Sequence, residues 1–295
     1  MKHTFPSLSQ ITLSILSISI TLPLTHAGAP PKIPGFTLTW SDSFSGSAGS
    51  LASSSKWEYE TPATNQNNEI QHYTSSPQNA NLSGSSTLYI TPLYSSGKWT
   101  SARISTLQSW GCANGAEMIV SASIKMGSSD PTHQQGIWPA FWTLGESFRS
   151  DNMWPECGEW DIMEQVNGVS ANVGTIHYGS ASYPLAIGSP NAWFDRSAWH
   201  TYGIRISRVG DWQSQSITWE LDGNAYFTVT GAMVGDYASW VKLVGETYFV
   251  ILNVAVGGMY PGMPNALTRG GMGSGMEVGY VAVYNGVGSG AGGGW

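Results

Sequence analysis

The feature that most constrains the fold is a long series of short β-rich runs, each ended by a turn. The runs are rich in Val, Ile, Thr, Tyr, Phe and Trp, and clusters of Gly, Pro, Asn, Asp and Ser separate them roughly every 8–15 residues. No segment keeps the 3.6-residue apolar period of an amphipathic helix, so long helices are not expected. An all-β sandwich or barrel of antiparallel strands is therefore predicted. The expected strands are residues 37–40, 87–91, 118–125, 138–144, 159–166, 173–178, 200–206, 216–221, 225–229, 248–256 and 277–284.

Residues 28–285 are predicted to form one domain, because no linker or break in composition divides them. The preceding 27 residues have the pattern of a secretory signal. Lys2 stands near the start, residues 11–24 carry no charge, and small residues precede a cleavage point after Ala27. An N-terminal anchor or a buried helix is the alternative. Residues 286–295 are a Gly-rich tail. We therefore expect a secreted, extracellular protein.

Composition excludes several classes of partner. The chain has 12 Lys and Arg against 19 Asp and Glu, a formal net charge of −7, and no cluster of basic residues. Nucleic acids and anionic membrane surfaces are therefore not expected as partners. Apolar residues make up 41% of the chain, with 14 Trp and 13 Tyr, so a large core can form and disorder is excluded. Few charges and many aromatic residues suit a neutral, polyhydroxylated ligand, and we expect a monomer.

Cys112 and Cys157 are the two cysteines of the chain. An oxidising extracellular compartment favours a disulfide between them. Such a bridge would close a loop of about 45 residues and contribute roughly 4 kcal/mol in the chain-entropy model. Two buried free thiols are the alternative. A zinc site is not indicated, because the cysteines lack matched His partners.

Three carboxylates are concentrated in the predicted strand that begins at Glu159. Glu159 and Asp161 are two positions apart and share one face of a regular strand. Glu164 would lie on the other face unless a β-bulge near residues 162–163 returns it to the same side. Acids on one face repel one another and resist burial, so a structural strand has little reason to keep them. A glycosidase does need such a cluster, because it uses a carboxylate nucleophile beside a carboxylic acid. The alternative interpretations of the three acids are a solvated acidic strand and a cation site.

The segment from Gly158 to Glu164, GEWDIME, resembles the bulged Glu-x-Asp-x-x-Glu motif of glycoside hydrolase family 16, in its laminarinase and endo-β-1,3-glucanase-like branch. The resemblance covers about residues 36–285. Further blocks typical of the family follow in the expected order: WE (57–58), NEIQHY (68–73), SARI (101–104), GIWPAFWTLG (136–145), GTIHY (174–178), WH (199–200), LDG (221–223), LNVAVGG (252–258) and MEV (276–278).

The resemblance implies a β-jelly-roll sandwich of two antiparallel sheets with a concave substrate cleft. It also implies retaining endo-hydrolysis of a β-linked glucan, with Glu159 as nucleophile, Glu164 as general acid/base and Asp161 as helper. This chemistry requires no metal or organic cofactor. The Asp that binds calcium in several relatives is replaced by Gly279, so a calcium site is not predicted.

Five further residues are candidates for substrate binding. Trp138 and Trp142 share a strand face by their even spacing and offer flat surfaces to sugar rings, with a core role as the alternative. His177, Arg103 and Asn68 match family positions near the substrate, with structural or surface roles as the alternatives. Trp160 and Ile162 alternate with the acids and are expected to face the core.

The leading hypothesis is a secreted endo-β-1,3- or β-1,3/1,4-glucanase with a polysaccharide substrate. An endo-β-1,3-galactanase or a transglycosylase keeps the mechanism, and loops after Asn65 and over residues 181–193 would carry the difference. A non-catalytic β-glucan-binding protein is the third hypothesis, although such proteins typically lose the acids. Asn81, in the Asn-Leu-Ser sequon, is a candidate glycosylation site, and an unused sequon is equally consistent.

Overall fold

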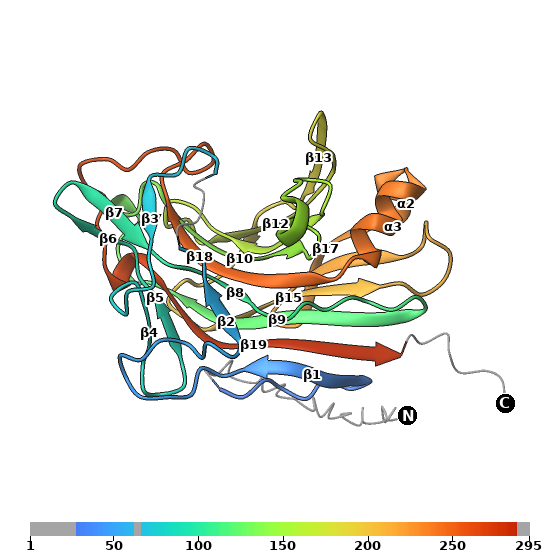
Figure 1. Cartoon of the computed structure of the whole chain (residues 1–295), viewed down its shortest axis with the longest axis horizontal. Coiled ribbons are helices and arrows are strands. Elements are labelled where there is room, and N and C mark those ends of the chain that lie inside the picture. Colours follow the sequence, from blue (N-terminus) through green and yellow to red (C-terminus); the bar gives the residue numbers. More distant parts are fainter. Residues whose placement is uncertain (1–27, 62–65, 288–295) are drawn as a thin grey trace, which may run out of the picture.

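Two antiparallel sheets pack face to face in the computed structural model, which describes residues 28–61 and 66–287 (Figure 1). The first sheet runs in the order β17-β16-β15-β9-β19-β5-β4, and β1 also pairs with β19. Its strands are β1 (Phe36–Asp42), β4 (Ala80–Leu82), β5 (Leu88–Ile90), β9 (Ala116–Met126), β15 (His200–Ser207), β16 (Ser216–Leu221), β17 (Asn224–Thr230) and β19 (Met276–Val287).

The second sheet runs in the order β13-β12-β11-β10-β18-β8-β2, and the short β14 also pairs with β12. Its strands are β2 (Trp57–Tyr59), β8 (Arg103–Thr106), β10 (Ile137–Gly145), β11 (Glu159–Glu164), β12 (Ala171–Ser180), β13 (Tyr183–Gly188), β14 (Ala192–Trp193) and β18 (Tyr248–Val256). A small third sheet consists of β3 (Gln71–Tyr73), β6 (Leu93–Ser95) and β7 (Lys98–Ser101). The architecture confirms the prediction of an all-β sandwich.

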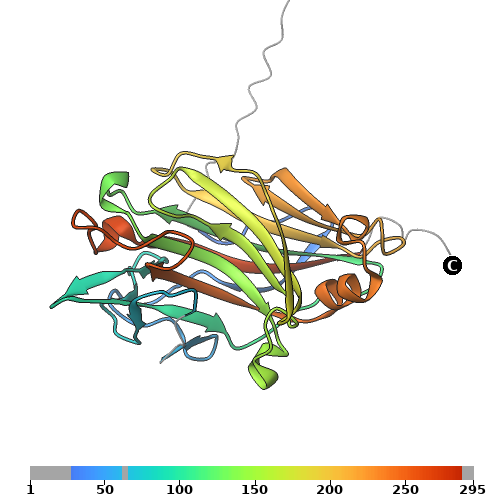
Figure 2. The same ribbon diagram turned by 90° about the horizontal axis from the view of Figure 1, so that it is seen from above.

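Three α-helices lie outside the two layers: α1 (Phe148–Asp151), α2 (Gly231–Val234) and α3 (Tyr237–Gly245). Two 3-10 turns, η1 (Pro131–His133) and η2 (Met272–Ser274), complete the described elements. Seen from above, α2 and α3 (orange) lie at one end of the strands, and the segment after β18 (red-orange) lies at the other (Figure 2). Among the described residues, no helix has the length and apolar character needed to cross a membrane.

The main core fills the space between the sheets, and β18 shows how the second sheet supports it. All nine residues of β18 are buried. Val250, Leu252 and Val254 belong to the main core, whereas Phe249 and Ile251 pack in a separate cluster. Neighbouring strand residues point to opposite faces, so the second sheet is also partly covered on its outer face.

The predicted disulfide is wrong: Cys112 and Cys157 are both free and buried. Cys112 belongs to the main core, where its thiol lies 3.3 Å from the Ala116 carbonyl oxygen. Cys157 packs in the separate cluster with Leu144 and Phe249. Burial raises the pKa of Cys112 to about 11 and that of Cys157 to about 12, so both thiols stay protonated and unreactive.

Two other expectations concern the ends of the chain. The secretory signal predicted for residues 1–27 lies outside the described residues. The tail was expected to start at residue 286, but β19 continues through Val287 by pairing with β9. The rest of the tail lies outside the described residues.

Candidate active site

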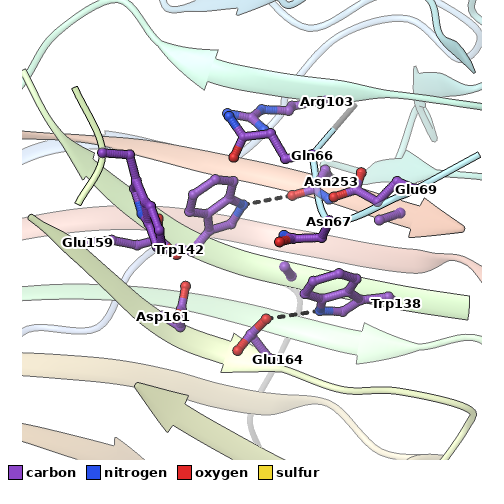
Figure 3. A pocket seen from close by; sticks show the side chains of 13 residues that line it. Gln66, Asn67, Glu69, Arg103, Trp138, Trp142, Glu159, Asp161, Glu164 and Asn253 are labelled. Carbon is purple, nitrogen blue, oxygen red and sulfur yellow. Dashed lines mark hydrogen bonds between the residues drawn. The ribbon is translucent and has the colours of Figure 1, made fainter. Parts of the chain in front are cut away.

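A pocket with about 690 Å³ of empty space lies on the outer face of the second sheet, away from the main core. Strands β8, β10, β11 and β18 form its floor, and segments before β3 and after α1 contribute side chains (Figure 3). It is lined by Gln66, Asn67, Glu69, Arg103, Trp138, Ala140, Trp142, Trp154, Glu159, Asp161, Glu164, Asn253 and Ala255.

The three acids reach this pocket together because β11 contains the predicted bulge. On β10 the partners of Glu159, Asp161 and Glu164 are Leu144, Trp142 and Ala140, which are spaced by two residues. The register shifts between Asp161 and Glu164, so one residue of β11 has no counterpart there. The extra residue returns Glu164 to the face of the other two acids.

Side chains from other strands satisfy the backbone at the bulge. Trp219 on β16 donates its indole N–H to the Asp161 carbonyl oxygen at 2.7 Å, and Asn172 on β12 donates to the Ile162 carbonyl oxygen at 3.2 Å. Trp160, Ile162 and Met163 are buried in the main core, as the alternation predicts for the first two. Buried backbone carbonyls need such partners, so these contacts stabilise the irregular strand.

Two indoles hold the outer carboxylates. Trp154 donates its N–H to Glu159 Oε2 at 2.7 Å, and Trp138 donates its N–H to Glu164 Oε1 at 2.9 Å. Figure 3 shows the Trp138 contact beside the row of acids. Each hydrogen bond fixes the direction of a carboxyl group that a strand backbone alone would leave free to rotate.

Asp161 lies between the two glutamates and is the most buried of the three, with a side chain 4% exposed. His177 on β12 places Nε2 at 3.1 Å from Asp161 Oδ2 and at 3.9 Å from Glu159 Oε1. Asp161 is also hydrogen-bonded to Glu159. One imidazole therefore faces two carboxyl groups from the neighbouring strand.

Burial and mutual repulsion raise the pKa of all three acids. Burial, then the charge of Asp161, raises the pKa of Glu159 to about 8. Burial, then the charge of Glu159, raises the pKa of Glu164 to about 7. The pKa of Asp161 is also well above its usual range, chiefly through burial. The trio therefore holds at least one proton near neutral pH, as acid–base work requires.

A polar network forms the opposite wall. Trp142 donates its N–H to Asn253 Oδ1 at 2.7 Å, and Asn253 donates to the Tyr73 hydroxyl at 3.0 Å. Tyr73 in turn donates to Glu69 at 3.3 Å. The Arg103 guanidinium lies 4.7 Å from the centre of the Trp142 ring. This wall presents fixed polar atoms around one flat aromatic face, an arrangement suited to a sugar ring.

The structure brings most of the candidate site residues together. Trp138, Trp142 and Arg103 line the pocket with the acids. His177 lies directly beside the acids. Asn68 is exposed and does not line the pocket, because its neighbours Gln66 and Asn67 take that position. Asn81 is on β4 of the first sheet and does not line the pocket; it is half-buried, and its amide donates to the Leu82 carbonyl oxygen at 3.1 Å.

Sequence reasoning did not single out Glu69, Asn253 or Trp154. Asn253 carried a usable signal, because a lone amide stands in the otherwise apolar run of β18. Buried polar side chains are hydrogen-bonded, and the partner of Asn253 is a pocket residue. Trp154 lies outside any strand, so no periodicity pointed to it.

A family model described as "XgeA-like, catalytic GH16 domain" matches residues 54–189. The crystal structure of an endo-1,3-beta-glucanase from Streptomyces sioyaensis is 33% identical, covers 88% of this chain and 99% of its own, and has a TM-score of 0.78.

Curated relatives give the same result. A beta-glucanase from Rhodothermus marinus is 29% identical over 290 residues, which are 92% of this chain and 93% of that protein. Glucan endo-1,3-beta-glucosidase A1 from Niallia circulans is 30% identical over 287 residues, 86% of this chain but 38% of that protein. The chain thus spans about a third of the length of the first curated relatives that it matches.

Proposed function

The chain belongs to glycoside hydrolase family 16, and on that basis we propose that it cleaves β-1,3-linked or mixed β-1,3/1,4-linked glucans within the chain, with retention of configuration. The observation that carries the proposal is the row of Glu159, Asp161 and Glu164 on one strand face inside a pocket. The names of the relatives that cover most of the chain support a β-glucan as substrate.

The two outer glutamates take the two catalytic roles. Glu159 attacks the anomeric carbon while Glu164 gives its proton to the glycosidic oxygen, so the leaving sugar departs as an alcohol. Glu164 then takes a proton from water, and the resulting hydroxide releases the sugar from Glu159. Glu164 ends the cycle protonated and Glu159 ends it ionised. Its pKa of about 7 allows Glu164 to serve in both directions.

Asp161 fixes the position of the nucleophile. It shares a side-chain hydrogen bond with Glu159, and burial raises its own pKa well above the usual range. The charge of Asp161 and this hydrogen bond raise the pKa of Glu159, whereas His177 and the Trp154 N–H lower it by favouring the ionised form. Asp161 is thus a positioning residue that holds the Glu159 carboxyl group beside the scissile bond.

The pocket walls select the sugar. Trp138 and Trp142 share the face of the acids and offer apolar surfaces to the C–H faces of pyranose rings. Arg103, Glu69 and Asn253 supply hydrogen-bonding groups for hydroxyls on the wall away from β12. Galactose differs from glucose at one hydroxyl, so discrimination between the two sugars depends on the polar side chain that faces that hydroxyl.

The proposed setting of the enzyme has three parts, each with its own test. Residues 1–27 direct secretion and are removed. N-terminal sequencing of the exported protein tests this proposal.

Asn81 carries a glycan when the host glycosylates the protein. Mass spectrometry before and after deglycosylation tests this proposal. The enzyme acts as a monomer, which sedimentation velocity checks.

The test of function combines a substrate panel with variants of the acids. Wild-type protein should release reducing ends from laminarin, lichenan or both, and NMR should show the β-anomer as the first product. Glu159→Gln and Glu164→Gln should each lose at least about a thousandfold in kcat. Glu58→Gln is the control, because Glu58 is exposed on β2 and does not line the pocket.

Azide separates the two roles. With a good leaving group, Glu159→Gly plus azide should give the α-glycosyl azide, because azide replaces the missing nucleophile. Glu164→Ala plus azide should give the β-glycosyl azide, because azide then attacks the glycosyl-enzyme. Cleavage of β-1,3-galactan alone would contradict the proposed substrate, and a first-formed α-anomer would contradict retention.

A further inference from the structure

The face that carries the acids continues beyond β11 onto β12. Val173 and Thr175 stand opposite Glu164 and Asp161 in the register of β11 and β12, and both side chains are partly exposed. Directly opposed residues in a sheet share a face. The sheet face that carries the acids therefore continues past the catalytic row, on the side away from β10 and beyond the residues that line the pocket.

The next strand, β13, leaves this extension open. Ala186 and Gly188 are opposite His177 and Thr175, and both are exposed. The alternate residues, Leu185 and Ile187, pack against the main core. At these two positions β13, which rises above the rest of the sheet in Figure 1, thus presents no large side chain on its outer face.

Trp193 completes the same surface. It is opposite Ala171 on β12, two positions before Val173, and its side chain is 69% exposed. The next residue, Phe194, packs against the main core, so Trp193 points to the outer face. The Trp193 indole is mostly exposed to solvent and lies on the same sheet face as the acids. It is therefore available to stack against a ligand that extends from the pocket over β12.

The two sides of the catalytic row differ in character. On the β10 side, Arg103 and Asn253 are buried within a connected polar wall. On the β12 side, Thr175 and Ala186 leave an open surface. A glycosyl group that stays bound to Glu159 needs the enclosed side, whereas a leaving sugar and an incoming water need an open one.

We propose that the surface formed by Val173, Thr175, Ala186, Gly188 and Trp193, here named the edge shelf, binds the glucan units on the leaving-group side of the scissile bond. Trp193 provides the stacking surface for a pyranose ring. The proposal rests on the proposed function and deepens it. The edge shelf also holds an acceptor sugar after the leaving group departs, so a sugar hydroxyl competes there with water for the glycosyl-enzyme.

Substrates that differ only on the leaving-group side test this assignment. A laminari-oligosaccharide reaches across the edge shelf, whereas an aryl β-laminaribioside places only a phenol beyond the scissile bond. Trp193→Ala should lower kcat/KM for the oligosaccharide about tenfold, equivalent to about 1.4 kcal/mol, and change that for the aryl glycoside less than about twofold. It should also lower the ratio of transglycosylation to hydrolysis at high oligosaccharide concentration. Trp193→Phe should retain most of both properties.

Tyr183 provides the matched control. It lies on β13, the strand that carries Ala186 and Gly188, and like Trp193 it is 69% exposed. Its register position, opposite Ser180, alternates with those of Ala186 and Gly188. Tyr183→Ala should leave both substrates and the product ratio unchanged.

Equal losses on the two substrates, or no loss on the oligosaccharide, would overturn the role of Trp193. Wild-type cleavage that Glu159→Gln abolishes would still support the proposed function in that case. If the wild-type protein cleaves neither substrate, the proposed function fails and this inference fails with it.

Discussion

At Glu164, opposing influences act on one carboxyl group. Burial and the charge of Glu159 raise its pKa, whereas the N–H of Trp138 stabilises the ionised form and lowers it. The balance leaves the pKa at about 7, where the residue can both give and take a proton. Trp138 therefore acts on the acid–base group directly, in addition to offering its ring to a sugar.

Trp138→Phe should shift the alkaline limb of the pH profile of kcat/KM upward. The variant loses the donor that favours ionised Glu164, so the acid form persists to higher pH. We expect an upward shift of about 0.5–1 pH unit together with a lower maximum, because the ring also lines the pocket. A full pH profile of both proteins on an aryl glycoside measures the shift. A limb that moves downward, or stays in place, would contradict the role of this hydrogen bond.

At the level of single residues, the sequence predicted the acids but not their partners. Glu159, Asp161 and Glu164 belong to a short motif, and their spacing predicts that they share one face of the strand if the strand contains a bulge. Trp154 and Glu69 reach the pocket from segments without regular periodicity, so only the folded chain reveals them. Long-range packing, which no local pattern encodes, decides these positions.

At the level of elements, the bulge in β11 is the feature on which the site depends. It lets Ile162 and Met163 both face the core while Glu164 faces the pocket. Trp219 and Asn172 satisfy the two carbonyl oxygens at the bulge from other strands. The strand thus keeps its core contacts on one face and three acids on the other.

Deletion of Ile162 should lower stability while it keeps the three acids on one face. Without the extra residue, Glu164 follows Glu159 by four positions, so a regular strand still turns both toward the pocket. The core loses the buried Ile162 side chain, and we expect the unfolding free energy to fall by about 2–5 kcal/mol, as chemical denaturation measures. Ile162→Val keeps the bulge and should cost only about 1 kcal/mol of stability with near-normal activity. A deletion variant as stable as the wild-type protein would contradict the role of the bulge in keeping Ile162 in the core.

Gly158 positions the start of β11. Its φ of +77° lies in the left-handed region, and a Cβ there would meet the Tyr248 hydroxyl oxygen at 2.2 Å. Tyr248 cannot readily move, because its ring stacks on Trp160 at 3.6 Å and its hydroxyl donates to the Leu243 carbonyl oxygen at 2.6 Å. The backbone conformation next to Glu159 therefore requires glycine.

Gly158→Ala should lower both stability and kcat. Strain and the clash should cost about 2–4 kcal/mol, and displacement of Glu159 should slow catalysis at least tenfold. Gly223→Ala is the matched control, because Gly223 has a φ of +75° with nothing within 4 Å of the added Cβ. The control should cost about 1 kcal/mol with unchanged kcat, as chemical denaturation and steady-state kinetics measure. Equal effects of the two substitutions would mean that contact with Tyr248 is unimportant.

Most of the longer strands could be predicted from the sequence, but the expectation of a loop over residues 181–193 was wrong, because β13 (Tyr183–Gly188) and β14 lie there. All the expected runs correspond to strands, because β-branched and aromatic residues repeat between clear turns. Three-residue strands such as β2 and β3 are too short to show alternation, and α3, with nine residues, is too short for a sustained helical period. The Cys112–Cys157 pairing failed because sequence spacing does not say which cluster a side chain joins.

At the level of the whole molecule, the sandwich gives the second sheet two different tasks. One face closes the main core, and the other carries buried acids whose proximity opposes folding. The surrounding core tolerates this cost because four large tryptophans, Trp57, Trp160, Trp219 and Trp240, are fully buried within it. The favourable free energy of core burial thus offsets the unfavourable free energy of keeping the three acids close together.

This cost predicts a dependence of stability on pH. In the folded state the pKa values of Glu159 and Glu164 are about 8 and about 7, above the value of 4.5 for a free glutamate. The folded chain therefore binds more protons than the unfolded chain between about pH 4.5 and pH 8, and stability falls as pH rises through this window. Glu164→Gln removes one of these groups and relieves the repulsion of the other.

The wild-type protein and Glu164→Gln should accordingly differ in unfolding free energy by about 1–3 kcal/mol more at pH 8 than at pH 5, in favour of the variant. Urea denaturation at both pH values measures this difference, and titrations common to both proteins cancel in it. Glu58→Gln, on the exposed face of β2, should follow the wild-type protein at both pH values. Parallel pH profiles for wild type and Glu164→Gln would mean that Glu164 titrates normally in the fold, and the protonated acid that the mechanism requires would then be absent near neutral pH.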